Sequence, residues 1–421
     1  MLLSLKLNNC MIYNSEVEFT MHANMHYKRF PNNVVKAGQV NALKTAVLFG
    51  PNNTGKTSFV RCIDAIKLIM LNRSIGISNN LFSNNPIVEM AISFLQDKKE
   101  YLFEFRFDVS KQEYIYERFA NIVRDRHKNV RVEDLLVRDS ENKQYYATDN
   151  NLTNAMKVAS RKNLLVYLMD TESFPDLQQI KDTIVAFASR IDIVDMNNIP
   201  IQKTIDMLKL SEEAHNKIAT FIRNADLMLD DFRYLKDDEL KISINGKSDV
   251  SIKPQEQVIL QTTSIMDILH LASVYQGVAL PSMLFDSTGT KKMAALASYV
   301  IDALEKDRVL IIDELDNSLH FRLTRAIIAL FNNELNQGAQ LIATVHDVSL
   351  LDCHTLFRKE QIWFTHKDRE NAYLYSLAEF TAEKDGVRDT SDLIEKYQKG
   401  VFGALPEPDL FQSLLEVRGL G

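Results

Sequence analysis

The fold is decided by residues 50–57, which read Gly50-Pro51-Asn52-Asn53-Thr54-Gly55-Lys56-Thr57. A glycine, four variable positions and then Gly-Lys-Thr form the phosphate-loop pattern. A mostly apolar run at 43–49 precedes the loop, and apolar residues at helical spacing follow it through 58–71. This strand–loop–helix context is the one the motif requires. It predicts that backbone N–H groups and the positive end of the helix dipole bind phosphate oxygens.

Two residues of the loop carry specific chemistry. Lys56 would reach the β- and γ-phosphates of ATP, and the Thr57 hydroxyl would ligate Mg²⁺. The expected cofactor-binding set is therefore Gly50, Pro51, Asn52, Asn53, Thr54, Gly55, Lys56, Thr57 and Ser58.

A second motif ends an apolar strand at 309–312, where Asp313 and Glu314 follow side by side. Two adjacent acids at the end of an apolar strand are costly to place unless a cation or a reaction needs them. In a phosphate-loop protein, Asp313 would hold magnesium and Glu314 would polarise the attacking water. The alternative is that the two acids merely begin a turn. That alternative does not explain why they occur in the same chain as the phosphate-loop lysine, Lys56.

Two weaker motifs occur in the sequence, one before and one after the acidic pair. Ser287 and Gly289 stand before apolar residues at helical spacing, and a Ser-x-Gly cap is an anion-binding design. His346 follows a second apolar strand at 341–345 and could sense a γ-phosphate. A histidine that merely satisfies a strand end is the alternative.

Composition limits the class of protein. The chain has 421 residues, 46% hydrophobic and 25% charged, which predicts a globular protein of about two or three domains. Three isolated cysteines predict a reducing cytosol. No apolar run approaches the ~20 residues of a membrane span, and the N-terminus is too polar for a secretion signal, so we expect a cytoplasmic protein with no membrane contact. The net charge of −7 requires any DNA contact to be a local patch.

The remaining patterns predict further elements. Three segments alternate with period two and predict an antiparallel meander: 88–95, 101–107 and 114–119. Amphipathic spacing predicts a mostly helical insertion at 121–235. Its basic run is more simply a solvated face than a nucleic-acid site; the run consists of Arg124, Arg126, His127, Lys128 and Arg131. A β-hairpin is expected around Asn245-Gly246.

The motifs together resemble a known group of proteins. GPNNTGKT, DSTGTKK, VLIIDELDNSLH and LIATVHD, in that order, resemble the ATP-binding-cassette (ABC) type ATPases of the SMC/RecF/OLD group. Stretches at 224–232, 358–364, 374–377 and 397–406 resemble the AbiLi/RloA-like AAA family of abortive-infection ATPases.

The resemblance implies an α/β fold: an ABC-type phosphate-loop ATPase head with an antiparallel β subdomain and a helical insertion. The domains would be an N-terminal ATPase half at 1–120, the insertion at 121–235, a C-terminal ATPase half at 236–380 and a tail at 381–421. Two heads would sandwich two ATP molecules, as a homodimer or within a higher homo-oligomer.

The resemblance also implies roles for individual residues. Lys56, Thr57, Asp313 and Glu314 would come from one subunit, and Ser287 and Gly289 of the other would contact the γ-phosphate. Asp316 and Asn317 would form the loop that couples the two sites, and His346 would be the switch histidine. Catalysis is assigned to Glu314, His346 and Lys56, and metal binding to Thr57 and Asp313.

Two functions follow as hypotheses. The first is an ATP-hydrolysing subunit of a bacterial anti-phage system that controls a separately encoded effector, which the resemblance implies to be RloB/AbiLii-like or another nuclease or toxin. The second is a RecF/SMC-like DNA-repair ATPase, although the insertion is too short for a long coiled coil and the net charge is negative. A transporter subunit would need a membrane partner, to which the tail motifs do not point.

Overall fold

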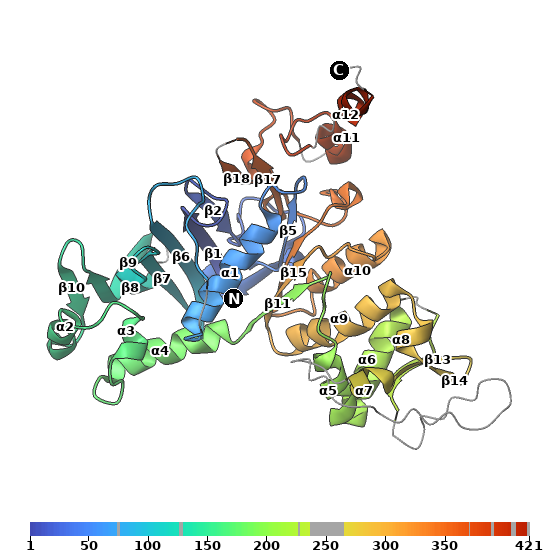
Figure 1. Cartoon of the computed structure of the whole chain (residues 1–421), viewed down its shortest axis with the longest axis horizontal. Coiled ribbons are helices and arrows are strands. Elements are labelled where there is room, and N and C mark those ends of the chain that lie inside the picture. The colour runs from blue at the N-terminus through green and yellow to red at the C-terminus, as the bar shows by residue number, and fades with distance from the viewer. Residues whose placement is uncertain are drawn as a thin grey trace. The chain divides into compact units, whose positions relative to one another are not determined.

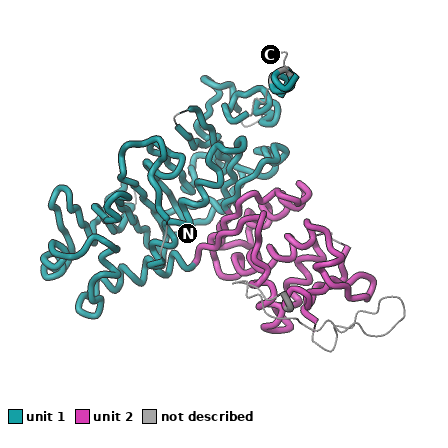
Figure 2. Tube along the Cα trace, in the orientation of Figure 1, with its two compact units in different colours: residues 1–189, 342–421 teal, residues 190–341 magenta. Residues whose placement is uncertain are grey.

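A computed structural model of the chain describes residues 1–73, 76–125, 129–225, 228–235, 265–369, 371–388, 391–405 and 410–418 (Figure 1). Two compact units divide the chain: residues 1–189 with 342–421, and residues 190–341 (Figure 2). The domain limits predicted at 120, 235 and 380 divide the chain by expected role and not by compactness, and they stay a prediction. The hairpin expected around Asn245-Gly246 lies outside the described residues, as do Arg126, His127 and Lys128.

The first unit contains a seven-stranded antiparallel sheet with the order β10-β9-β8-β7-β6-β1-β2. Its strands are β1 (Leu2–Asn8), β2 (Val17–Thr20), β6 (Ile87–Gln96), β7 (Lys99–Asp108), β8 (Glu113–Arg124), β9 (Val130–Asp139) and β10 (Gln144–Ala147). The predicted meander is β6–β8, and its register places Phe103 opposite both Ile92 and Phe119. The alternating aromatic side chains of β7 are buried, as expected for a core stripe.

The expectation of helices from residue 121 onward is wrong for the described residues 121–125 and 129–147. There β8 continues to its end, and β9 and β10 add two strands to the sheet. The physical reason is cross-strand pairing of β-branched and apolar residues, which favours strands: Ile122 lies opposite Val132, and Phe119 opposite Leu136.

Helices do fill much of the rest of the predicted insertion. They are α2 (Asn150–Met156), α3 (Leu165–Leu168) and α4 (Pro175–Ala188) in the first unit, and α5 (Gln202–Leu210) and α6 (Glu212–Asn224) in the second. One strand interrupts them, β11 (Ile191–Asp195). On α4, Phe187 stacks on Phe94 of β6 with ring centroids 4.1 Å apart, so this helix covers the antiparallel sheet.

The phosphate-loop pattern follows β5 (Thr45–Phe49) and extends into the first turn of α1 (Lys56–Met70), in the predicted order of strand, loop and helix. β5 is buried along its length and pairs in parallel with β17 (Ile362–Lys367), which pairs antiparallel with β18 (Ala372–Ser376). Phe19 of β2 contacts Phe59 of α1 and Trp363 of β17 at centroid distances of 4.9 and 4.8 Å. A shared aromatic core therefore fixes α1 beneath the loop.

Smaller elements complete the first unit. They are the hairpin β3 (Val34–Ala37) and β4 (Val40–Leu43), the 3₁₀ turns η1 (Pro31–Asn33), η2 (Val348–Leu350), η3 (Lys359–Gln361) and η4 (Leu377–Glu379), and the tail helices α11 (Leu393–Gln398) and α12 (Leu410–Val417). The strand β16 (Gln340–Thr344) carries the chain back into this unit, where the Val345 N–H donates to the Leu48 carbonyl at 3.0 Å.

The second unit is built around the acidic strand. β15 (Val309–Asp313) is fully buried and pairs in parallel with β11, so that Asp195 lies opposite Asp313. Helices α9 (Thr288–Glu305) and α10 (Phe321–Phe331) flank it in sequence, and the smaller elements are α7 (Ile265–Leu269), α8 (Ser282–Phe285), β12 (Asp231–Tyr234), β13 (Leu271–Tyr275) and β14 (Val278–Pro281). A core of α5, α6 and α9 side chains includes Ile205, Ile218 and Ala297. No helix in the described ranges has the length and apolarity to cross a membrane.

Candidate functional site

Two glycines of the phosphate loop stand where no side chain fits. A Cβ on Gly50 would lie 2.3 Å from Thr365 Oγ1 and 2.5 Å from the Thr365 carbonyl oxygen. Gly55 has φ +117°, and a Cβ there would lie 2.7 Å from Ile12 Cδ1. Contacts this short require the neighbouring atoms to move, and a positive φ strains any L side chain. The pattern's glycines are therefore required by the packing of the first unit.

Side-chain hydrogen bonds from within the motif and from outside it hold the loop. Thr54 Oγ1 donates to the Pro51 carbonyl at 2.8 Å and lies 2.7 Å from Thr365 Oγ1. Tyr13 Oη donates to the Gly55 carbonyl at 3.0 Å. Burial raises the pKa of Tyr13 well above its ordinary value, so the phenol keeps the proton it donates. The backbone that would surround a phosphate is thus held from two sides.

Lys56 begins α1 and is buried. Its Nζ donates to the Gly50 carbonyl at 2.6 Å and to the Pro51 carbonyl at 2.9 Å, which places the ammonium against the loop it would serve. Thr57 is exposed and Ser58 half-buried at the start of the same helix. An ammonium and a helix N-terminus at one loop form an arrangement suited to binding an anion.

In the second unit, the acidic pair ends β15 in a strained turn. Asp313 is buried. Glu314 has φ +57°, a left-handed conformation that costs a non-glycine residue about 1–2 kcal/mol. The Asn317 N–H donates to the Glu314 carbonyl at 2.8 Å and closes the turn. Strain of this kind persists only where surrounding contacts enforce it, and it concentrates at functional sites.

The Glu314 carboxylate has two amide partners, of which only Asn317 lies within a sequence motif. Its Oε2 accepts from Asn197 Nδ2 at 2.9 Å and from Asn317 Nδ2 at 3.0 Å. Asn197 follows β11 in the region predicted to be helical, and sequence reasoning missed it. The only signal that could have revealed it is the parallel pairing of β11 with β15, which brings the ends of both strands together.

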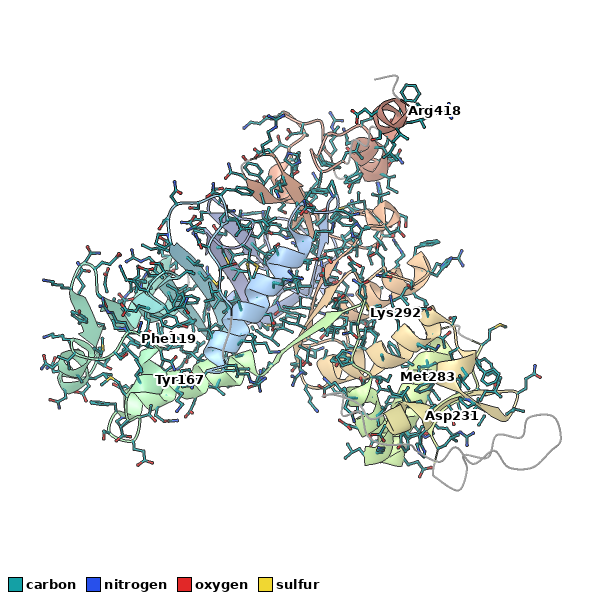
Figure 3. All side chains as sticks on the ribbon, viewed as in Figure 1. Phe119, Tyr167, Asp231, Met283, Lys292 and Arg418 are labelled. Atoms are coloured by element: carbon teal, nitrogen blue, oxygen red, sulfur yellow. The ribbon has the colours of Figure 1, made fainter. Side chains whose placement is uncertain are left out.

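Ser287 and Gly289 lie at the start of α9, as predicted. Ser287 Oγ accepts from the Thr290 N–H at 3.1 Å and so caps the helix. A Cβ on Gly289 would lie 2.8 Å from the Ser318 carbonyl oxygen. The loop that follows β15, which includes the half-buried Asp316, therefore packs directly on the first turn of α9. Lys292, labelled in Figure 3, extends from the same helix to that loop, with its Nζ 3.0 Å from Asn317 Oδ1.

The predicted site residues thus form two groups, each within one unit. The loop from Gly50 to Ser58 belongs to the first unit, as does the exposed His346 beyond β16. The second unit brings together the acidic turn with Asp313 and Glu314 and the cap of α9 with Ser287. Hydroxyl and carboxylate oxygens of the kind carried by Thr57 and Asp313 suit Mg²⁺, which usually takes one or two protein ligands and completes its shell with phosphates and water.

Comparisons with solved structures find heads of SMC proteins. One, an SMC head bound to the C-winged-helix domain of ScpA, is 14% identical and has a TM-score of 0.47, covering 91% of this chain and 99% of that chain. The SMC head domain from Thermotoga maritima is 12% identical with a TM-score of 0.42, covering 89% and 98%. An Smc head with an extended coiled coil, bound to the C-terminal domain of ScpA from Pyrococcus furiosus, is 12% identical with a TM-score of 0.42, covering 94% and 99%.

A search of curated proteins finds no match. A protein family described as "AAA domain, putative AbiEii toxin, Type IV TA system" matches residues 46–352. The match begins in β5, ahead of the phosphate loop, and ends beyond His346, so it contains both groups of site residues. It confirms, at the level of this family, the resemblance to AAA-type ATPases that the motifs indicate. Because the matched region is most of the chain, the protein belongs to this family of AAA domains.

Proposed function

We propose that the protein binds and hydrolyses ATP with Mg²⁺ and controls a separately encoded effector in bacterial anti-phage defence. The observation that carries the ATP-binding part is the position of the Lys56 ammonium, 2.6 Å from a carbonyl of the loop whose glycines admit no side chain. Membership of the AAA-domain family supports nucleotide binding, and the association of this family with a toxin of a Type IV TA system supports a partner.

Each site residue would have a separate role in ATP binding and hydrolysis. Lys56 would exchange its loop carbonyls for phosphate oxygens, which accept stronger, charge-assisted hydrogen bonds. Thr57 and Asp313 would hold Mg²⁺, which neutralises charge on the phosphates. Glu314 would orient the attacking water and accept its proton, and His346 would contact the γ-phosphate.

A second copy of the chain would complete each site. Its Ser287 and Gly289, at the N-terminus of α9, would contact the γ-phosphate of the first copy's ATP, where a helix dipole favours negative charge. Asp316 and Asn317 would couple the two sites. ATP would therefore act as the bridge of a homodimer, alone or within a larger assembly.

The DNA-repair alternative would need basic side chains that are available to DNA phosphates, and the described part of the basic run does not favour it. Two arginines of the basic run are engaged by neighbouring acids: Arg124 Nε lies 2.6 Å from Glu100 Oε2, and Arg131 Nη2 lies 2.9 Å from Glu133 Oε1.

Lys56→Ala tests nucleotide binding. The substitution leaves phosphate charge unneutralised, and hydrogen bonds to charged groups are worth about 1.5–3 kcal/mol each, so we expect affinity for ATP to fall roughly 10- to 100-fold. Calorimetric titration with ATP·Mg measures it. Lys67→Ala, in the last turn of the same helix, is the matched control and should bind as the wild type does. Equal affinity of Lys56→Ala and wild type would remove the basis of the proposal.

The effector is tested separately. Phage challenge of cells that carry the gene with and without its chromosomal neighbours should show protection only when a neighbour is present, and co-purification should identify which one. Protection by this chain alone would overturn the effector part and leave the ATPase part standing.

A further inference from the structure

The Glu314 carboxylate is one end of a continuous set of side-chain hydrogen bonds within residues 190–341. Asn197 and Asn317 both donate to its Oε2, at 2.9 and 3.0 Å, and Asn317 Nδ2 also lies 2.7 Å from Asn197 Oδ1. Two donors on one oxygen fix the plane of the carboxylate and hence the direction of its other oxygen. For a group that must aim at a water molecule, that direction decides the rate.

The far end of the network is on α9. Lys292 Nζ lies 3.0 Å from Asn317 Oδ1 and 3.2 Å from Ser318 Oγ. An ammonium has only donors, so it requires the oxygen of the Asn317 amide on its side. The nitrogen of that amide then faces Glu314 and Asn197. Lys292 thereby sets the orientation of Asn317, five positions after the serine that caps the same helix.

The network has room to rearrange. Asn197 and Lys292 both line a cavity of about 250 Å³, together with Met196, Ile199, Met283 and Ala295. Met283 and Lys292 are labelled in Figure 3. A side chain that leaves Glu314 can therefore turn into open space instead of displacing core atoms, so a small movement of α9 can change the hydrogen bonds on Glu314 without disrupting the packed interior.

We propose that Asn197 is a positioning residue for Glu314, and that Asn317 and Lys292 link the same carboxylate to α9. The inference rests on the proposed function, in which Glu314 is the base and α9 faces the ATP of the second copy. The inference adds that the rate of hydrolysis in one copy depends on the position of its α9 relative to the ATP of the other copy.

Substitutions at Asn197 provide the direct test. Asn197→Ala removes one donor from Glu314. Asn197→Asp has nearly the same shape but replaces the donor by a carboxylate that repels Glu314. We expect kcat for ATP to fall about 10- to 100-fold in both variants, the range that follows from misplacing a catalytic group by about 1 Å, while KM changes less than about twofold. The matched control is Asn198→Ala, an amide in the same loop that also lines the cavity; it should keep the wild-type kcat.

Lys292 tests the link to α9. Lys292→Met keeps the aliphatic stem and removes the donor, and should lower kcat by a similar factor, whereas Lys292→Arg should retain most of it. The double variant Asn197→Ala with Lys292→Met should lose much less than the product of the single losses, because both changes disturb one network. Thermal unfolding of each variant reports whether it folds. If the Asn197 variants do not fold, the kcat of Lys292→Met tests whether the network positions Glu314.

The outcomes separate the two claims. Wild-type kcat in both Asn197 variants, an equal loss in Asn198→Ala, or additive losses in the double variant would overturn this inference while the wild type still hydrolyses ATP. A wild-type chain that neither binds nor hydrolyses ATP would overturn the proposed function, and this inference with it.

Discussion

At the scale of single residues, Asp108 offers a clear pH dependence. Its Oδ1 accepts from the Ser110 N–H at 3.0 Å, the Ser110 hydroxyl at 2.6 Å and the Lys111 N–H at 3.1 Å, in the turn between β7 and β8. Burial by itself would raise the pKa of this carboxyl, but the hydrogen bonds from Ser110 and Lys111 outweigh it and lower the pKa from 3.8 to about 2.

The depressed pKa predicts where Asp108 stabilises the fold. An acid whose pKa is lower in the folded state contributes stability above its unfolded pKa and loses it as pH falls toward the folded value. Asp108→Asn should therefore be less stable than wild type at pH 7, and the difference should shrink between about pH 4 and pH 2. Urea unfolding across that range measures it. A difference that stayed constant with pH would show that the carboxylate charge is not involved.

Some site residues could be predicted singly and others could not. Gly50, Gly55 and Lys56 lie at fixed spacings within residues 50–56, so the phosphate-loop pattern identifies them, although the atoms that exclude a side chain at Gly50 belong to Thr365. Asn197 contacts Glu314 across 117 positions. An asparagine after a strand has many roles, and only the pairing of β11 with β15 gives it this one.

At the scale of elements, the buried pair Arg138–Glu117 fastens α3 to the antiparallel sheet. Arg138 on β9 is 1% exposed; it donates to Glu117 Oε1 at 2.8 Å and to the carbonyls of Ser160 and Asn163. The Leu165 N–H, at the start of α3, donates to the other oxygen of Glu117 at 3.2 Å. Burial raises the pKa of Glu117, which Arg138 opposes.

Arg138→Met should therefore leave a buried carboxyl without its cation, at a cost of about 3–5 kcal/mol in unfolding free energy. The double variant Arg138→Met with Glu117→Leu should recover only part of that loss: it removes the unpaired charge, but the Leu165 N–H and the carbonyls of Ser160 and Asn163 lose their partners. Arg131→Met is the control on the same strand, because its pair with Glu133 is largely exposed and should contribute less than about 1 kcal/mol. Denaturant unfolding ranks the three; an Arg138 effect as small as that of Arg131 would contradict the account.

The cap of α9 gives a second element-scale prediction, because Ser287 has both a structural and a proposed binding role. Ser287→Ala should cost about 1 kcal/mol of stability through loss of the cap. Ser287→Asp should keep the cap and suit the helix dipole, yet its charge should repel the other copy's triphosphate and prevent ATP-driven dimerisation. Thermal unfolding and light-scattering mass separate the two effects. A Ser287→Asp protein that dimerised with ATP as wild type does would argue against contact between Ser287 and phosphate.

Element type was predictable where pattern and length agreed, as for β5, α1 and β15. The prediction of element type failed for the described residues 121–125 and 129–147, where short apolar runs fit helix and strand equally and the neighbouring strand decides. Val132 favours the sheet because Ile122 lies opposite it, and that partner is chosen by the fold.

At the scale of the whole molecule, the order of motifs predicted the family, whereas the two compact units depend on contacts between distant segments. The first unit closes only when the chain returns at residue 342, and Thr365, far beyond the loop, is the residue that excludes a side chain at Gly50. Contacts between distant segments of this kind follow from tertiary packing, which local patterns do not encode.

In the proposed function ATP bridges two copies of this chain, and Glu314→Gln should trap the bridged state. The variant should bind ATP but not hydrolyse it, because the amide cannot accept the proton of the attacking water. Its mass, measured by light scattering with and without ATP·Mg, should double on addition of nucleotide, and adding Lys56→Ala should abolish the change. A Glu314→Gln protein that binds ATP and keeps the same mass would contradict the account.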